Sequence, residues 1–276
     1  MTVLGPASDS PGLDAELLLA HVLGCGRAWL KAHGEAAASE PEAARYADLI
    51  ARRAAGEPVA YLLGHQGFMD LDLLVGPGVL VPRPETELLV ETTLELVRGM
   101  ASPALLDLGT GSGAVILALA HARRDARVTG VEVSAAALGF TRRNAERLDL
   151  SGLELLEGSW YQPLSGRRFH CIVSNPPYLA TDDPHLPGLA CEPRSALVAG
   201  PLGTESLARV IEGAPAHLMA GGWVVVEHGH LQGGVARELM GSAGLARIES
   251  RRDLAGHERV TLGEYTGGPS SVQEPS

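Results

Sequence analysis

The chain has 276 residues, of which 45% are apolar, and a formal net charge of −11 at pH 7. This length allows one large domain, or a medium domain with a small one, and the apolar content is enough for a real core. The acidic balance argues against stable binding of nucleic acid, because proteins that hold phosphates usually carry a basic face.

Three cysteines, Cys25, Cys171 and Cys191, are scattered and lack Cys-x-x-Cys spacing. This pattern predicts neither a disulfide framework nor a zinc site, and it suits a reducing compartment. The first residues show no basic segment followed by an apolar one, and the apolar stretches are too short to span a bilayer. We therefore expect a cytoplasmic protein with no signal peptide, no membrane association and no metal.

Residues 1–58 are predicted to form a small helical domain. Leucines and valines over 13–23 recur at helical spacing, and a second helix is expected over about 41–54. Residues 59–82 change character and predict a β-hairpin linker, with its extended pieces around Gly76-Pro77-Gly78. A larger domain is expected to follow the linker.

Residues 83–266 predict that larger domain, because strand and helix candidates alternate after an amphipathic helix over 85–99. Such alternation predicts an α/β, Rossmann-like fold with a mostly parallel sheet. The last two strands are adjacent and predict an antiparallel edge, and residues 267–276 predict a disordered tail. The expected elements are strands at 103–108, 127–132, 153–157, 169–174, 222–227, 245–251 and 258–264, and helices at 114–123, 135–147, 203–219 and 232–243.

A glycine-rich turn, Gly109-Thr110-Gly111-Ser112-Gly113, separates the first of these strands from its helix. Glycine lets the backbone turn sharply and approach a ligand, and the helix start offers free N–H groups. Asp107 precedes the turn, and Glu132 ends the next strand. Their separation is close to the roughly 20 residues expected for a carboxylate that binds ribose hydroxyls.

The turn leaves more than one ligand to consider. A dinucleotide usually needs Gly-x-Gly-x-x-Gly, whereas this chain has Gly-x-Gly-x-Gly. A carboxylate at Asp107 suits the cationic amino acid portion of S-adenosylmethionine better than it suits a pyrophosphate. The structural alternative is a tight turn without a ligand, which would leave Asp107 and Glu132 buried at a cost and without a role.

The strand 169–174 leads into Asn175-Pro176-Pro177-Tyr178. Because proline fixes the backbone, the Asn175 side-chain oxygen and the Pro176 carbonyl are expected to form two fixed acceptors for a planar NH₂ group, either a carboxamide or a base amine. Tyr178 would stack on that group. Such acceptors would favour a pyramidal nitrogen that attacks a sulfonium methyl. The alternative is an ordinary strand-end turn, where Asn-Pro is common.

With these motifs, the chain resembles the release factor glutamine methyltransferases, the HemK family, from about residue 13 to 265. The combination of VPRPETE with NPPY is highly specific, whereas NPPY alone also occurs in adenine-N6 methyltransferases. The segments that carry the resemblance are GEPVAYLLGHQGF (56–68), VLVPRPETELLVE (79–91), LLDLGTGSGAVILALA (105–120), GVEVSAAAL (130–138), GSWYQPL (158–164), SNPPYL (174–179), EPRSALVAGPLG (192–203), GGWVVVEHGHLQGG (221–234) and RRDLAGHERV (251–260).

The resemblance implies methyl transfer from S-adenosylmethionine to the N5 nitrogen of the glutamine in the Gly-Gly-Gln loop of class 1 peptide chain release factors. S-adenosylhomocysteine is the implied product, and residues 1–58 would contact the release factor. A monomer is expected. The implied cofactor positions are Asp107, Gly109, Thr110, Gly111, Ser112, Gly113, Glu132, Trp160 and Asn175. The implied catalytic and substrate positions are Asn175, Pro176, Pro177 and Tyr178, with Arg83 and Glu85 over the site.

Glu132 departs from the family pattern, which more often has Asp at this position, and the longer side chain should still reach the ribose. Other residues keep open alternatives. Trp160 is a ligand lid or core, Phe68 is hairpin core or pocket wall, and Arg83 lies over the site or in a surface loop. The run Glu227-His228-Gly229-His230 has the look of a metal cluster but fits a strand terminus better.

Two rival functions remain at this stage. An adenine-N6 methyltransferase acting on DNA or RNA would use the same Asn-Pro-Pro-Tyr geometry on a flipped base. It would normally need a target-recognition region and a basic surface, which this acidic chain lacks. A cofactor-binding partner of the translation machinery without activity is the other reading, and the intact Asn175 and Tyr178 argue against it.

Overall fold

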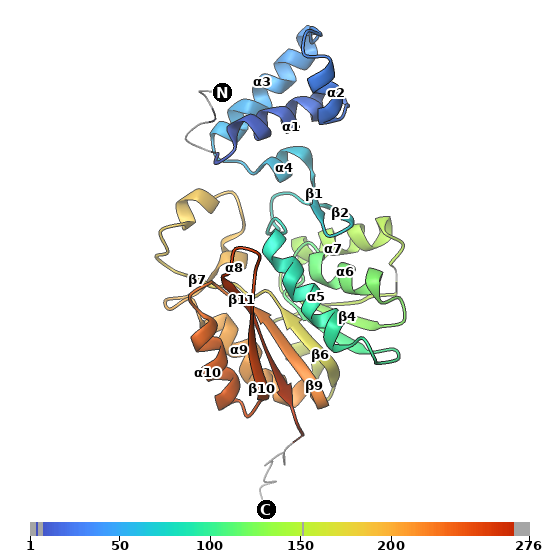
Figure 1. The fold of residues 1–276 in the computed structure, drawn as a ribbon, viewed down its shortest axis with the longest axis vertical. Helices are drawn as coiled ribbons and strands as arrows, with labels where there is room; N and C mark the ends of the chain where they lie inside the picture. Colours follow the sequence, from blue (N-terminus) through green and yellow to red (C-terminus); the bar gives the residue numbers. More distant parts are fainter. Residues whose placement is uncertain (1–3, 5–7, 151, 268–276) are drawn as a thin grey trace, which may run out of the picture.

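The computed structural model describes residue 4, residues 8–150 and residues 152–267. Three helices, α1 (Pro11–Leu23), α2 (Arg27–Ala32) and α3 (Glu40–Ala54), form a small bundle at one end of the molecule (Figure 1). The bundle buries apolar side chains of α1 and α3 against α4 (Val59–Leu63). Ser39 and Glu42 form a capping box that starts α3. The predicted helices are confirmed, and α2 is an addition.

The linker has a different internal layout from the one predicted. It opens with α4, and its hairpin pairs β1 (His65–Phe68) with β2 (Leu71–Leu74). The expected position around Gly76-Pro77-Gly78 was wrong, because Pro77 has no N–H for a ladder and residues 75–83 form no strand. Phe68 is 1% exposed and packs in the main core, so it is hairpin core.

The large domain contains a seven-stranded sheet with the order β10-β11-β9-β6-β3-β4-β5. Its strands are β3 (Ala104–Leu108), β4 (Arg127–Glu132), β5 (Glu154–Glu157), β6 (Phe169–Ser174), β9 (Leu218–Glu227), β10 (Ala246–Arg252) and β11 (Glu258–Tyr265). The α/β, Rossmann-like prediction is confirmed. The last two strands, β10 and β11, pair antiparallel at one end of the sheet, so the predicted antiparallel edge is confirmed. β11 lies between β9 and β10 and runs antiparallel to both.

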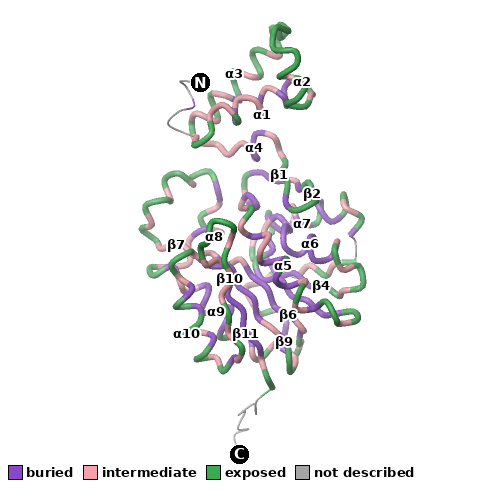
Figure 2. The backbone as a smooth tube through the Cα atoms, in the orientation of Figure 1, coloured by how far each residue is buried: buried purple, intermediate pink, exposed green. Residues whose placement is uncertain are grey.

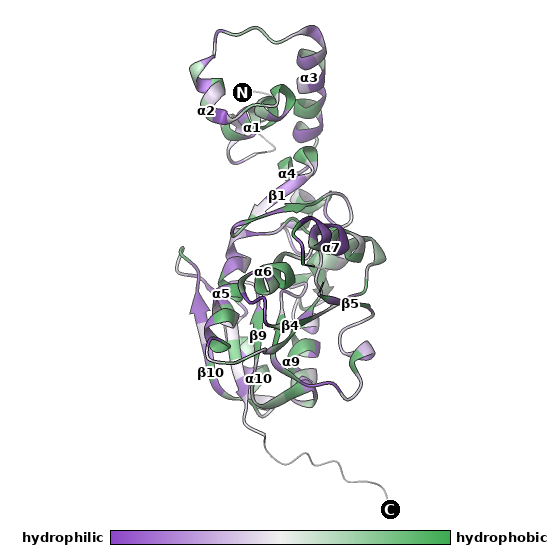
Figure 3. Cartoon of the chain, turned by 90° about the vertical axis from the view of Figure 1, so that its right-hand side faces the viewer, coloured by the Kyte–Doolittle hydropathy of each residue, from purple (hydrophilic) through white to green (hydrophobic). Residues whose placement is uncertain are grey.

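Helices cover both faces of this sheet. One core joins the sheet to α5 (Glu87–Leu96), α6 (Ala114–Ala122) and the end of α7 (Ala135–Arg147), and the other joins it to α9 (Glu205–His217) and α10 (Gly233–Ser242). Cys171 belongs to the first core and Ile172 to the second, as the alternation of a strand requires. The central strands are accordingly buried on both sides (Figure 2), and α6 is apolar over its visible length (Figure 3).

Between β6 and α9 the chain forms small elements that the sequence did not predict. They are β7 (Leu179–Ala180), a short 3-10 helix (Leu186–Leu189), α8 (Arg194–Leu197) and β8 (Val198–Gly200). Further 3-10 helices lie earlier in the chain, at Pro84–Thr86 and Gln162–Leu164. Among the described residues, no helix combines the length and the apolar character needed to cross a membrane. The predicted tail falls outside the described residues except for Gly267.

Gly130 of β4 offers a test of the packing behind the glycine turn. A Cβ at this position would lie 2.5 Å from Thr110 Cγ2 and 2.6 Å from Ile116 Cδ1. We expect Gly130→Ala to lower the free energy of unfolding by about 1–3 kcal/mol through overpacking. Urea unfolding measures this, with Gly139→Ala in α7 as the control, since nothing lies within 4 Å of that position. Equal stability of the two variants would contradict this close packing around Gly130.

Candidate active site

A cavity opens at the carboxyl ends of β3, β4 and β6, with about 1060 Å³ of space between atoms when the open solvent at its mouth is included. Parallel strands present their carboxyl ends at one edge, and this is where open α/β sheets bind ligands. The cavity wall combines short segments that are distant in sequence. They are residues 78–80, 82–83, 86, 107, 109–112, 114–115, 131–134, 137, 158–160, 175, 177, 193 and 195–196.

The glycine turn presents bare backbone to this cavity. Gly109 and Gly111 have φ of 81° and 57°, and a Cβ at either position would meet nothing within 4 Å. Gly113 differs, because its Cβ would lie 2.7 Å from Leu117 Cδ1, and it lies outside the cavity lining. Gly113 therefore serves the packing of the helix, whereas the other two leave room for a ligand.

Glu132 is held in place by the backbone around it. Its Oε2 accepts a hydrogen bond from the Gly111 N–H at 2.9 Å, and its Oε1 accepts one from the Ser134 N–H at 2.8 Å. The residue is 8% exposed and lines the cavity. A carboxylate fixed in this way keeps further lone pairs for hydroxyl donors, which fits a ribose.

Asp107 is a buried acid with an unused oxygen at the cavity wall. It is 1% exposed, and its Oδ2 has no hydrogen-bond partner within the described part of the chain. Burial raises the pKa of Asp107 to about 8, and the neighbouring Glu132 carboxylate adds to this effect. A buried polar atom without a partner is costly, so this oxygen fits a cationic group such as an ammonium.

Asn175 follows β6 and faces the same cavity. The strand end is fixed by Ser174, whose hydroxyl donates to the Leu108 carbonyl at 2.7 Å. The Asn175 Nδ2 donates to Thr86 Oγ1 at 3.1 Å. Because the nitrogen is engaged there, the side-chain oxygen is the atom of this amide left for the N–H of a ligand.

The other three residues of the Asn-Pro-Pro-Tyr run differ in whether they line the cavity. Pro177 lines the cavity beside Asn175, whereas Pro176 and Tyr178 lie outside its lining. The Tyr178 carbonyl accepts a hydrogen bond from Gln232 Nε2 at 3.0 Å, which anchors the run to the start of α10. Burial raises the pKa of Tyr178 to about 12, so its phenol is neutral at physiological pH.

Trp160 and Arg83 also lie at the cavity, whereas Glu85 does not. Trp160 lines the cavity and also packs against the second core, so it is both part of the cavity wall and part of the core. Arg83 pairs with Glu192, whose other oxygen accepts a hydrogen bond from the Val81 N–H at 2.9 Å. This buried carboxylate joins the segment before α5 to the segment before α8.

Sequence reasoning missed part of the cavity wall. Residues 78–82 were predicted to be linker, yet most of them face the cavity. Pro193, Ser195 and Ala196 were noted only within a segment that carried the family resemblance. No residue of these two walls bears chemistry of its own except Ser195, so composition offered no signal for them.

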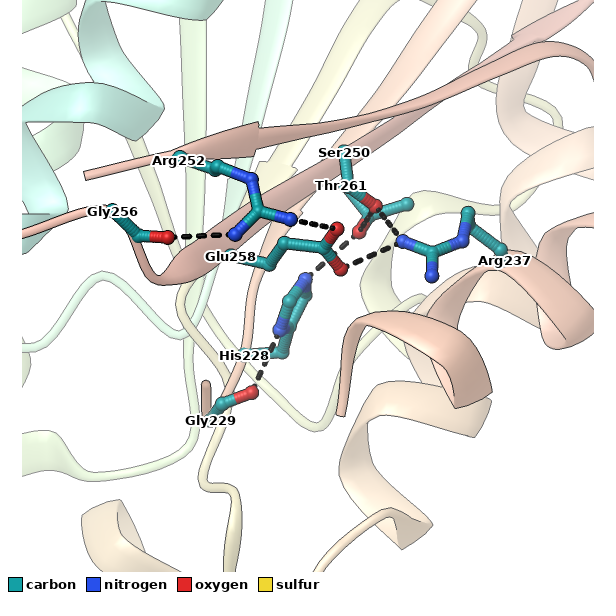
Figure 4. A network of polar contacts seen from close by, with 8 residues as sticks. All are labelled: His228, Gly229, Arg237, Ser250, Arg252, Gly256, Glu258 and Thr261. Carbon is teal, nitrogen blue, oxygen red and sulfur yellow. Dashed lines mark hydrogen bonds and ion pairs between the residues drawn. The ribbon is translucent and has the colours of Figure 1, made fainter. Parts of the chain in front are cut away.

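The run after β9 is a strand terminus. The His228 Nδ1 donates to the Gly229 carbonyl at 2.9 Å, and its Nε2 accepts from the Thr261 hydroxyl at 2.8 Å (Figure 4). Both ring nitrogens are thus engaged, and burial lowers the pKa of His228. Within the described ranges, no three His, Cys, Asp or Glu side chains gather as a metal site would require.

Comparison with known proteins identifies the family. Residues 3–64 match the family described as "PrmC N-terminal domain", and residues 84–186 match "Methyltransferase small domain". A release factor glutamine methyltransferase of Pseudomonas aeruginosa is 47% identical over 262 residues, which cover 94% of this chain and 95% of that protein. This chain belongs to the release factor glutamine methyltransferases. A protein of the same name from Xylella fastidiosa is 46% identical over 92% of this chain and 94% of its own length.

A solved structure agrees on the fold. A methyltransferase from Pyrococcus furiosus superimposes with a TM-score of 0.54 at 21% identity, covering 80% of this chain and 99% of that one. At this identity the likeness shows the methyltransferase fold alone. The release factor glutamine methyltransferase family thus accounts for both parts of the chain, the helical bundle and the sheet domain.

Proposed function

We propose that this chain transfers a methyl group from S-adenosylmethionine to the N5 amide nitrogen of the glutamine in the Gly-Gly-Gln loop of class 1 peptide chain release factors. One observation carries the proposal beyond family membership. Asp107, Glu132 and Asn175 line a single cavity, so a cationic nucleoside and an amide acceptor site share one space. S-adenosylhomocysteine leaves as the product.

The cofactor fits the residues around the cavity. The unpartnered Asp107 oxygen would hold the ammonium, and Glu132 would accept hydrogen bonds from the ribose hydroxyls. Gly109, Gly111 and the neighbouring Thr110 and Ser112 let the backbone approach, and Trp160 would lie near the adenine. When bound, S-adenosylmethionine supplies an electrophilic methyl carbon.

The chain's own residues then orient the amide. The Asn175 oxygen and the Pro176 carbonyl accept hydrogen bonds from the two N–H atoms of the glutamine amide, and Pro177 and Tyr178 fix and flank that run. When these two acceptors hold both amide hydrogens, the nitrogen lone pair is less delocalised into the glutamine carbonyl. Holding the nitrogen near its target carbon contributes an effective molarity of about 10⁵ M or more. Arg83 closes the wall over the site, with Glu85 beside it on the substrate side.

Each part of the chain has its own proposed role. Residues 1–58 would contact the release factor, residues 59–82 would link the domains, and residues 83–266 would carry the reaction. We propose that the enzyme acts as a monomer in the cytoplasm. Its net charge of −11 supports the absence of stable nucleic acid binding.

A labelling experiment tests the function. The full chain is incubated with methyl-labelled S-adenosylmethionine and, separately, a class 1 release factor, its loop variant with the glutamine changed to alanine, and duplex DNA. We expect label in the release factor only, at the N5 position, and none in the loop variant. Label in DNA alone would support the adenine-N6 alternative, and no label anywhere would support a binding protein without activity.

A further inference from the structure

The amide of Asn175 needs a defined orientation to do the work assigned to it. Its oxygen must face the substrate, because an amide nitrogen cannot accept a hydrogen bond from a glutamine N–H. Its Nδ2 donates to Thr86 Oγ1 at 3.1 Å. A hydroxyl can donate as well as accept, so Thr86 alone permits either orientation of the amide.

A buried acid stands behind this pair. Glu227 ends β9, is 2% exposed and lies outside the cavity lining, whereas Thr86 and Asn175 lie on it. Ser174 of β6 pairs with Val226 of β9, so the next residues, Asn175 and Glu227, lie side by side at the strand ends. Thr86 and Asn175 both lower the pKa of the Glu227 carboxyl group. The Oε2 of Glu227 has no hydrogen-bond partner among the described residues, and the Thr86 hydroxyl and the Asn175 amide are the donors next to this carboxyl group.

The position of Glu227 is fixed by the strands around it. Glu227 pairs with Val260 of β11, and the next backbone N–H, that of His228, donates to the Arg259 carbonyl at 2.9 Å. The His228 ring is tied on both sides, within the network drawn in Figure 4. The carboxyl group is therefore presented to Thr86 from a rigid strand end.

We propose that Glu227 is a positioning residue that fixes the orientation of the catalytic Asn175 amide through the hydroxyl of Thr86. An ionised carboxylate can only accept, so the Thr86 hydroxyl donates its hydrogen bond to Glu227. The Thr86 oxygen must then accept from Asn175 Nδ2, and the Asn175 oxygen faces the substrate. This inference rests on the proposed function and adds two residues to it.

This hydrogen-bond relay, from Glu227 through Thr86 to Asn175, depends on the charge of Glu227. Burial raises the pKa of Glu227 to about 7; hydrogen bonding to Thr86 lowers it, Glu85 raises it, and Arg259 and Asn175 lower it. Tyr178 also faces this carboxyl group and is neutral in this pH range. A protonated carboxyl can donate to Thr86, which frees the hydroxyl to donate to the Asn175 oxygen and turn the amide. The parent kcat is therefore expected to fall as the pH is lowered through about 7.

Three variants and one pair test the relay, with release factor methylation as the assay at saturating S-adenosylmethionine. Glu227→Gln keeps the shape but permits both hydrogen-bond directions. Thr86→Val keeps the shape and removes the hydroxyl, whereas Thr86→Ser keeps the hydroxyl and removes a methyl group. The fourth protein combines Glu227→Gln with Thr86→Val. Each variant is characterised by kcat, by both KM values, by its pH profile and by its melting temperature.

We expect Glu227→Gln and Thr86→Val each to lower kcat by about 10- to 100-fold, within the range known for misplaced catalytic groups, with both KM values little changed. Glu227→Gln should lose the acidic limb of the pH profile and melt no lower than the parent. The double variant should be no slower than the slower single variant, because both changes break one relay. Thr86→Ser should retain most of the parent kcat.

The opposite results would overturn the relay. Parent-like kcat and pH profile in Glu227→Gln, or an active Thr86→Val beside an impaired Thr86→Ser, would mean that these residues act through shape alone. Multiplied losses in the double variant would mean that they act separately. Both results presuppose that the parent methylates the release factor. A parent chain without that activity would instead refute the proposed function, and the relay with it.

Discussion

Replacing Asn175 by alanine is expected to lower kcat by about 10²- to 10³-fold, in line with the loss of a preorganised group that acts on the reacting centre. The variant loses the side-chain oxygen that faces the cavity, and with it one of the two acceptors proposed for the glutamine amide. Single-turnover methylation of a release factor at saturating cofactor measures the chemical step directly.

Cofactor binding separates this effect from damage to the fold. The Asn175 side chain is tied to Thr86, whereas Asp107 and Glu132 are the residues proposed to hold the ammonium and the ribose. The dissociation constant for S-adenosylmethionine, measured by calorimetry, should therefore stay near that of the parent. An unchanged methylation rate in Asn175→Ala would show that the acceptor argument is wrong.

Replacing Asp107 by asparagine is expected to weaken S-adenosylmethionine binding by about 10- to 100-fold. Hydrogen bonds to charged groups contribute roughly 1.5–3 kcal/mol, and each 1.4 kcal/mol is a factor of ten. In the parent, the pKa of about 8 means that the carboxyl must lose its proton to hold an ammonium. The parent affinity should thus rise as the pH increases towards 8, and the variant should lack this dependence.

The same change should make the ligand-free protein more stable. The pKa of Asp107 rises from an ordinary 3.8 to about 8 on folding, so the folded chain binds the proton more tightly than the unfolded chain does. In the parent, the raised pKa of Asp107 contributes fully to the free energy of unfolding below about pH 4, and this contribution is lost as the pH rises through 8. The variant should exceed the parent in unfolding free energy by an amount that grows over this window, on the order of a few kcal/mol.

Asp182→Asn is the matched control for this pair of effects, because Asp182 is exposed and lies outside the cavity. Urea unfolding between pH 5 and 9 gives the stabilities, and calorimetry gives the affinities. A variant at Asp107 that binds the cofactor as the parent does would remove this residue from the proposed site.

Much of the sheet domain was predictable because its signals are local. The expected strand 127–132 coincides with β4, and the expected helix 135–147 coincides with α7. Burial in a sheet or against it gives each segment a characteristic spacing of apolar residues, and this spacing can be read from the segment alone. Asp107, Glu132 and Asn175 were each predicted at a strand end, and because the strands are parallel these three residues line one cavity.

The hairpin was less predictable, since two turn signals competed. Met69-Asp70 carries the turn, with Met69 at a φ of 50°, although Gly76-Pro77-Gly78 is the stronger turn sequence. The decisive factor is burial: Phe68 and Leu71, on either side of the turn, both enter the main core. Such a choice depends on contacts with distant strands and helices, which short-range sequence patterns do not report.

By itself, the sequence determined the α/β class, the glycine turn, and the acids and the amide at the strand ends. Each of these features depends on residues that are neighbours in the chain. Only the tertiary structure decided that β11 lies between β9 and β10, and that Thr86, Asn175 and Glu227 meet. These three residues come from separate elements, and hydrogen bonds between side chains far apart in the chain leave no periodic trace in it. Their meeting depends on how the whole sheet packs.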